Sequence, residues 1–249
     1  MDKEAETVEV LSFRLRGKMG HYRQPDTTIT QGTYPFPPRP ALLGLLGAIL
    51  GLDYNSPRWP EFLKAEHFLG LKLLAPVRTV CMQMSLLGKG FMAGGGKTAK
   101  FNRPTVMEMV VAPDYRVYYA GENLDDLKEK LSSRHSVFHT YLGSAFCLAF
   151  PLLEGIHKAE PVSPVNGGAL AINSVVPRDI VEQVELTAPA AYAAARAMPY
   201  QHRGDRTFEG SCTVFYEVGG NPLRVILNKE TKFPHRLLHL PSEEVICLW

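Results

Sequence analysis

The fold is decided by residues 13–52, FRLRGKMGHYRQPDTTITQGTYPFPPRPALLGLLGAILGL. Apolar and polar positions alternate from Thr7 to Gly17, and this period of two predicts a half-buried strand with one basic face. The inner face would carry Leu11, Phe13 and Leu15, and the outer face Ser12, Arg14 and Arg16.

A long loop and a buried helix are predicted to follow this strand. Residues 17–38 combine Gly, Pro, Thr and aromatic residues without periodicity, which is typical of an irregular connection. Ala41–Leu52 is an apolar run preceded by three prolines, whose fixed φ suits the first helical turn. Because a membrane-spanning helix needs about 20 apolar residues, this run predicts a short helix buried in a protein core.

The rest of the first 155 residues supplies further strands and helices. A short helix is expected from Ser56 to Ala65, and residues 69–87 read as a strand interrupted by a proline. Residues 105–120 read as one bent strand or a strand pair, and residues 123–131 have helical spacing. An apolar strand at 146–153 would complete the order strand, helix, strand, strand, helix, strand, which is the ferredoxin-like pattern.

The C-terminal part looks β-rich, with one short Ala-rich helix expected at Ala190–Ala197. Its strand candidates are Ala169–Val176, Val181–Leu186, Ser211–Val218, Leu223–Asn228 and Val245–Trp249. We therefore predict an α+β protein with a ferredoxin-like (RRM-type) βαββαβ core in residues 1–155. Residues 156–249 would form a β-rich extension packed on that core, because no linker separates the two.

Charge is segregated along the chain. The formal net charge is only +2, but residues 10–52 hold five Lys or Arg against one acid, Asp26. Residues 67–107 hold six Lys or Arg and no acid. Such segregation predicts one positive face, which is the electrostatic footprint of a polyanion partner. The alternative is that folding brings acidic segments next to these basic ones, so that no positive face results.

A glycine-rich segment at residues 88–98, GKGFMAGGGKT, invites comparison with a phosphate-binding loop. That loop requires Gly, four residues and then Gly-Lys-Ser/Thr, and the required first glycine falls on Phe91. The segment also precedes Pro104 and a strand pattern rather than a helix, so a nucleotide-binding enzyme is disfavoured. The remaining alternatives are an ordinary surface loop and a hairpin tip whose apolar apex and cationic arms contact nucleic acid.

Cysteine and histidine spacing gives no metal-site pattern. The four cysteines lie far apart in the sequence, which is typical of a reduced cytoplasmic protein with buried thiols. No cofactor is expected. His21 differs from the other histidines because Tyr22 and Arg23 follow it in the basic loop. It could support metal-independent RNA cleavage, although stacking and hydrogen bonding to unpaired bases is the simpler role.

Several motifs together resemble a known family. They are FRLRGKM at residues 13–19, Gln24-Pro25, PFPPRPALLGLLGAILG at residues 35–51, PDYRVY at residues 113–118 and YLGS at residues 141–144. This pattern resembles the CRISPR-associated protein five family, which are RAMP-superfamily subunits of type I Cascade complexes. The resemblance favours a type I-B-like subtype. It is most specific at the helix and covers about the first 155 residues.

The resemblance implies a fold and a function. A β-hairpin "thumb" would protrude from the ferredoxin-like core at about residues 82–107. The protein would be a non-catalytic subunit that binds and caps the 5′ handle of the guide RNA in antiviral defence. Its other partners would be the backbone subunit, the large subunit and, through the complex, target DNA, with no membrane. A metal-independent endoribonuclease that processes CRISPR repeat RNA is the alternative.

The residues expected to bind RNA come from three segments. The strand and loop contribute Arg14, Arg16, Lys18, His21, Tyr22, Arg23 and Gln24. The start of the helix contributes Arg39, Ala41 and Leu42, and the glycine-rich hairpin contributes Lys89, Phe91, Met92, Lys97, Lys100 and Arg103. Free N–H groups at a helix N-terminus favour a phosphate, which agrees with the place of Arg39.

Overall fold

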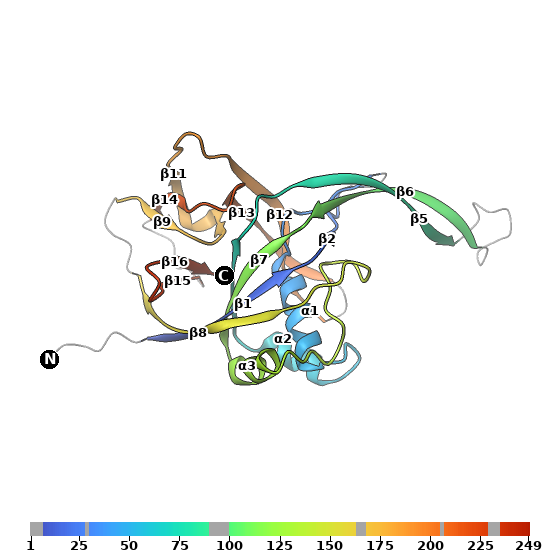
Figure 1. The fold of residues 1–249 in the computed structure, drawn as a ribbon, viewed down its shortest axis with the longest axis horizontal. Coiled ribbons are helices and arrows are strands. Elements are labelled where there is room, and N and C mark those ends of the chain that lie inside the picture. The colour runs from blue at the N-terminus through green and yellow to red at the C-terminus, as the bar shows by residue number, and fades with distance from the viewer. Residues whose placement is uncertain (1–6, 28–29, 90–99, 163–167, 205–206, 229–234) are drawn as a thin grey trace.

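A computed structural model describes residues 7–27, 30–89, 100–162, 168–204, 207–228 and 235–249. The protein is a mixed α+β, β-rich fold with few helices (Figure 1). Among the described residues, no helix is long and apolar enough to cross a membrane.

The largest sheet has six strands in the order β16-β15-β8-β1-β7-β4, and its paired strands run antiparallel. Two helices, α1 and α2, lie in sequence between β1 and β4, and α3 lies between β7 and β8. The strands are β1 (Val8–Arg16), β4 (His67–Leu73), β7 (Asp114–Gly121), β8 (Leu152–Pro161), β15 (Arg236–His239) and β16 (Val245–Leu248). The helices are α1 (Arg39–Leu50), α2 (Arg58–Lys64) and α3 (Leu124–Ser132).

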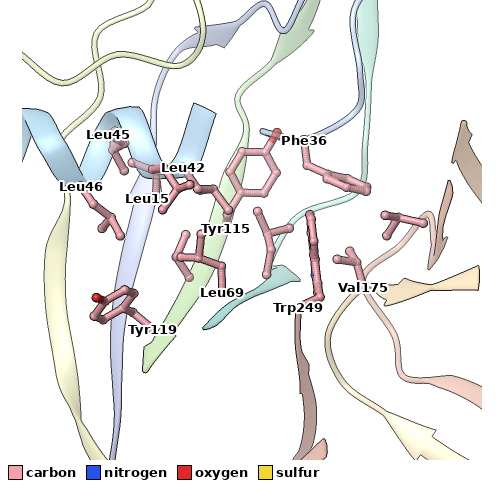
Figure 2. Packing of buried hydrophobic residues seen from close by; sticks show 14 of the residues in the cluster. Leu15, Phe36, Leu42, Leu45, Leu46, Leu69, Tyr115, Tyr119, Val175 and Trp249 are labelled. Carbon is pink, nitrogen blue, oxygen red and sulfur yellow. The ribbon is translucent and has the colours of Figure 1, made fainter. Parts of the chain in front are cut away.

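The main core forms where α1 packs against this sheet. Figure 2 shows Leu42, Leu45 and Leu46 of α1 facing Leu15 of β1, and all four side chains are buried. The inner face expected in β1 is confirmed, because Leu11, Phe13 and Leu15 are buried. The exposed outer face is confirmed only at its end, at Arg16, because Ser12 is 1% exposed and β1 lies inside the six-stranded sheet. The helices expected near residues 41, 56 and 123 are confirmed as well. Burial of apolar side chains at about 25 cal/mol per Å² is the main force holding α1 on the sheet.

A long two-stranded ribbon projects from the body (Figure 1). It consists of β5 (Thr79–Lys89) and β6 (Lys100–Val111), paired antiparallel from Thr79–Val110 to Lys89–Lys100. At its base two short strands, β2 (Met19–Gly20) and β3 (Thr30–Gln31), add to β6. The basic loop between β1 and α1 is thereby joined to the root of the ribbon.

The C-terminal part contributes two three-stranded sheets, in the orders β10-β13-β12 and β11-β14-β9, besides β15 and β16 of the six-stranded sheet. Tyr34 donates its hydroxyl hydrogen to the Ala197 carbonyl (2.8 Å), and Phe36 packs edge-on against Tyr216. The N-terminal loop therefore packs directly on this part. The strands are β9 (Leu170–Ile172), β10 (Val176–Pro177), β11 (Val181–Val184), β12 (Tyr192–His202), β13 (Phe208–Glu217) and β14 (Leu223–Leu227).

The helix expected at Ala190–Ala197 is wrong, because this segment begins strand β12. Alanine favours helix in isolation, but Ala193 and Ala195 pair with Tyr216 and Val214 of β13. Cross-strand pairing and burial of Ala195 outweigh the local preference. The conformation of this segment is therefore decided by long-range strand pairing, which local propensity does not take into account.

The strand expected at 146–153 is also wrong over most of its length, since β8 begins at Leu152. Phe146, Leu148 and Phe150 instead lie in the connection between α3 and β8, with 53%, 51% and 75% of their surface exposed. In the sequence this apolar run predicts buried core residues, whereas in the folded chain these three side chains lie on the surface. Contiguous exposed apolar side chains are uncommon unless they bind something.

Candidate nucleic-acid interface

A groove of about 550 Å³ brings together five segments that are distant in the sequence. Its walls come from the basic loop, the start of α1, the root of the β5–β6 ribbon, the connection before β8 and the C-terminal sheet. The lining residues are His21, Tyr22, Arg23, Gln31, Pro38, Pro40, Ala41, Leu86, Met107, Gly143, Ser144, Phe146, Pro199, His202 and Phe208. The groove therefore unites the predicted loop and helix start with the ribbon.

The basic loop is held rigidly by backbone hydrogen bonds. Tyr22 accepts from the Tyr34 N–H (2.8 Å) and donates its own N–H to the Thr33 hydroxyl (2.8 Å). His21 donates its N–H to the Leu142 carbonyl (3.0 Å), which ties the loop to the YLGS segment. Gly143 lies next to this bond with φ of +80°, a region that favours glycine. The YLGS motif thus positions the loop.

The imidazole of His21 has a fixed orientation. Its Nδ1 lies 2.8 Å from the Glu108 carbonyl oxygen, which can only accept, so Nδ1 carries a proton. In the neutral ring Nε2 is then an acceptor. This Nε2 atom is buried and has no hydrogen-bond partner among the described residues. Because this atom has almost no exposed surface, His21 anchors the loop through Nδ1 rather than presenting an acceptor to a ligand.

Tyr22 lies in the core rather than on the surface. Its side chain is 3% exposed, and burial raises the pKa of its phenol well above the usual value. Burial raises the pKa of the neighbouring Tyr115 in the same way, while the Tyr115 hydroxyl donates to the Pro35 carbonyl (2.9 Å). A phenol that resists ionisation in this way is a poor general base.

At the start of α1 the structure assigns Arg39 to the protein interior. Its guanidinium donates to the carbonyls of His67 (2.8 Å) and Trp249 (3.4 Å) and lies 5.2 Å from the centre of the Tyr200 ring. The Ala41 and Leu42 N–H groups both donate to the Pro38 carbonyl, Pro40 has no N–H, and the Leu42 side chain is buried. Few N–H groups therefore remain for a phosphate, and Arg39 joins α1 to β4 and the C-terminus.

The other predicted cations differ in their surroundings. Arg14 pairs with Asp114, with Nε 2.8 Å from Oδ1, so much of its charge is already balanced. Arg16, Lys18 and Arg23 form no ion pair with any described residue, which leaves them able to contact phosphates. Gln24 is fixed by an N–H···O bond from its Nε2 to the Thr33 carbonyl (3.2 Å).

The ribbon carries Lys100 and Arg103 as exposed side chains on β6. Lys89 ends β5, whereas Phe91, Met92 and Lys97 lie outside the described residues. Leu86 and Met107, at the root, line the groove, so the ribbon extends from one wall of it.

Two aromatic residues in the groove were missed by sequence reasoning. Phe146 and Phe208 line it and are about half exposed, at 53% and 50%. The apolar pattern places Phe146 in a buried strand, and Phe208 comes from a distant strand with no motif around it. Exposed phenyl rings on a groove are suited to stacking with unpaired bases.

His67, whose carbonyl accepts from the Arg39 guanidinium, should make stability depend on pH. Burial, with a smaller contribution from Arg39, lowers the pKa of its ring below about 6.5. The unfolded chain therefore binds the proton more readily, so the stabilisation is complete above about pH 6.5 and is lost as the pH falls from there through the lower pKa of the folded state. We expect the melting temperature to fall between about pH 7.5 and pH 5.5, with a smaller fall for His67→Gln. A wild-type melting temperature constant over this interval would contradict the expectation.

Comparisons with known proteins point to one family. The family model described as CRISPR-associated protein (Cas_Cas5) matches residues 10–78, which include β1, the basic loop and α1. None of the curated proteins matches the chain.

Two solved structures share the fold. One is a chain of a CRISPR RNA-guided surveillance complex, with 16% identity, a TM-score of 0.53 and coverage of 87% of this chain and 90% of that one. The other is a CRISPR protein from Archaeoglobus fulgidus, with 11% identity, a TM-score of 0.52 and coverage of 96% and 98%. The family model thus confirms, over residues 10–78, the resemblance of this chain to the CRISPR-associated protein five family.

Proposed function

We propose that this chain is a non-catalytic subunit of a type I CRISPR interference complex that binds and caps the 5′ handle of the guide RNA. The observation that carries the proposal is the groove in which the basic loop, the start of α1 and the root of the ribbon meet. The family resemblance falls on the first two of these segments. The similar chain from an RNA-guided surveillance complex is consistent with this role.

The chemistry of the groove favours single-stranded RNA. Among its described lining residues there is no Asp or Glu, whereas Arg23 is exposed at its edge. Phe146 and Phe208 offer faces for stacking with unpaired bases. Cations, aromatic rings and a few fixed polar groups are the combination that holds unpaired nucleotides.

The architecture supports the finer parts of the proposal. We propose that β1, α1, β4, β7, α3 and β8 form a ferredoxin-like core, which the strand order β8-β1-β7-β4 and the helices between β1 and β4 and between β7 and β8 support. The β5–β6 ribbon would be the thumb, and residues 156–249 the extension. As an end cap of the complex, the protein would contact the backbone and large subunits and meet target DNA only through the assembly. We assign it to a type I-B-like subtype.

The surroundings of Tyr22 favour binding over cleavage. Metal-independent RNA cleavage needs a general base within reach of the 2′-hydroxyl. Tyr22 is buried with a raised pKa, so it does not supply that base. His21 has one ring nitrogen engaged by the Glu108 carbonyl and the other buried. The endoribonuclease alternative therefore rests on residues that are poorly placed for it.

The proposal is tested by incubating the purified chain with labelled repeat RNA in EDTA. We expect saturable binding by fluorescence anisotropy and an intact RNA on a denaturing gel. Site-specific cleavage would favour the endoribonuclease, and absence of binding would refute the RNA-binding role.

The exposed cations of the ribbon should contribute to this binding. Replacing Lys100 and Arg103 together with Ala should lower the slope of log affinity against log salt by about 0.7 for each phosphate that the ribbon no longer neutralises. The matched control replaces two lysines of α2 and α3, Lys64 and Lys128, and should leave the slope unchanged. Equal slopes for the two double variants would exclude the ribbon from the RNA surface.

A further inference from the structure

A second and larger cavity, of about 650 Å³, lies beside the end of β1. One wall carries Arg14 and Arg16, and the other is formed by the connection between α3 and β8, including Arg134, Phe138 and Phe150. The proposed binding of the 5′ handle uses none of these residues except the two arginines of β1. The cavity is therefore a separate feature of the surface.

This cavity is linked to the groove through a third cavity that shares lining residues with both. A small cavity of about 230 Å³ along α1 contains Gly143, which also lines the groove. The same small cavity contains His139 and Thr140, which also line the larger cavity. The three depressions are thus neighbours along the connection from Phe146 back to Phe138 and to the end of β1, and we call them together the path.

The path is electrostatically suited to a polyanion. The described residues that line the three cavities include no Asp or Glu. Arg16 and Arg134 are exposed and have no carboxylate partner among the residues that the structure describes, in contrast to Arg14, which pairs with Asp114. Two unpaired guanidinium groups at the far end of an acid-free path favour phosphate oxygens.

The path also displays aromatic rings on a fixed backbone. Phe150 is 75% exposed and Phe138 is 45% exposed. The Phe138 N–H donates to the Ala48 carbonyl of α1 (3.0 Å), and the Ala149 N–H donates to the Thr140 carbonyl (3.0 Å). Because Ala149 also bridges to Gly17 after β1, the segment that presents Phe150 is anchored at both sides. Rings carried on an anchored backbone lose less conformational entropy on stacking with bases than rings on a free loop.

We infer that this path binds a further segment of the same single-stranded RNA, with phosphates at Arg16 and Arg134 and a base stacked on Phe150. The inference rests on the proposed RNA-binding function and extends the binding site beyond the groove. A protein partner would fit the apolar side chains, but the unpaired arginines and the absence of carboxylates among the described lining residues favour RNA.

The test compares a short oligoribonucleotide of about 4 nucleotides with a long one of about 16 nucleotides, each measured by fluorescence anisotropy. The long RNA is expected to bind more tightly. Phe150→Ala and Arg134→Ala should each weaken binding of the long RNA by about tenfold and leave the short RNA unaffected. Phe150→Trp should retain the affinity, because indole also stacks with bases.

The controls separate this inference from the proposed function. Leu186→Ala removes a side chain that is 74% exposed and lines none of the three cavities, so it should change neither affinity. If both RNAs bind equally well, or if Phe150→Ala and Arg134→Ala bind the long RNA normally, the extended path is refuted while the groove still binds RNA. If neither RNA binds the wild-type chain, the proposed function fails as well. Unchanged melting temperatures would exclude misfolding, because both mutated side chains are exposed.

Discussion

The Gly143→Ala variant is expected to lose about 3 kcal/mol or more of unfolding free energy. Single substitutions cause a loss this large only through a few mechanisms, of which backbone strain is one. Gly143 has φ of +80°, which costs an L-residue about 1–2 kcal/mol by itself. An added Cβ would also lie 2.0 Å from the His21 carbonyl oxygen and 2.8 Å from its carbon. These are backbone atoms of the loop that Leu142 fixes by a hydrogen bond, so they cannot move aside cheaply. Denaturant unfolding followed by circular dichroism measures the loss.

The same substitution should weaken RNA binding, because Gly143 and His21 both line the groove. For the stability measurement, Gly44→Ala is the matched control. Gly44 lies within α1, and an added Cβ there has no atom within 4 Å. Alanine in a helix interior is favoured over glycine by up to about 1 kcal/mol, so this variant should be slightly more stable than wild type. If Gly143→Ala unfolds at the same denaturant concentration as wild type, the close packing of the YLGS segment on the basic loop is wrong.

The parts of the fold that depend on local pattern were predictable. The period of two in β1 and the apolar run after the prolines of α1 each identify an element from its own residues, and both are observed. Ala190–Ala197 shows where this reasoning ends. Its composition favours helix, but pairing with β13 makes it a strand, and no local pattern contains that partner.

The candidate groove includes the basic loop and the helix start that the sequence singled out, but the contacts of several of their residues could not be predicted. The basic loop and the ribbon were identified by charge, and the structure joins them at one groove. Arg39 has the right charge at the right point of the chain, yet the carbonyls of His67 and Trp249 accept from its guanidinium. Trp249 is 210 residues away in the sequence. Phe208 could not be predicted for a similar reason. It lies in the C-terminal sheet, and only folding brings it to the groove.

The double variant Phe146→Ala, Phe208→Ala is expected to bind single-stranded RNA roughly 100-fold more weakly than wild type. Base–aromatic stacking contributes about 1–3 kcal/mol per base, so two lost platforms remove about 2–6 kcal/mol if their effects add. Both rings are about half exposed and line one groove, so truncation removes a binding surface while leaving the core packed. Anisotropy titrations at one salt concentration measure the change, because the electrostatic contribution varies with salt.

The single variants show how the loss divides between the two rings. Phe208 packs edge-on against the His202 ring with 5.4 Å between centroids, so its removal also alters a second ring at the groove wall. Phe146 has no ring partner among the described residues, so Phe146→Ala reports stacking more directly. Phe146→Trp should retain wild-type affinity, since it restores an aromatic face without adding charge. If Phe146→Ala and Phe146→Trp bind equally well, the ring does not stack with RNA. Stacking would then rest on Phe208, and the double variant should bind RNA no more weakly than Phe208→Ala alone.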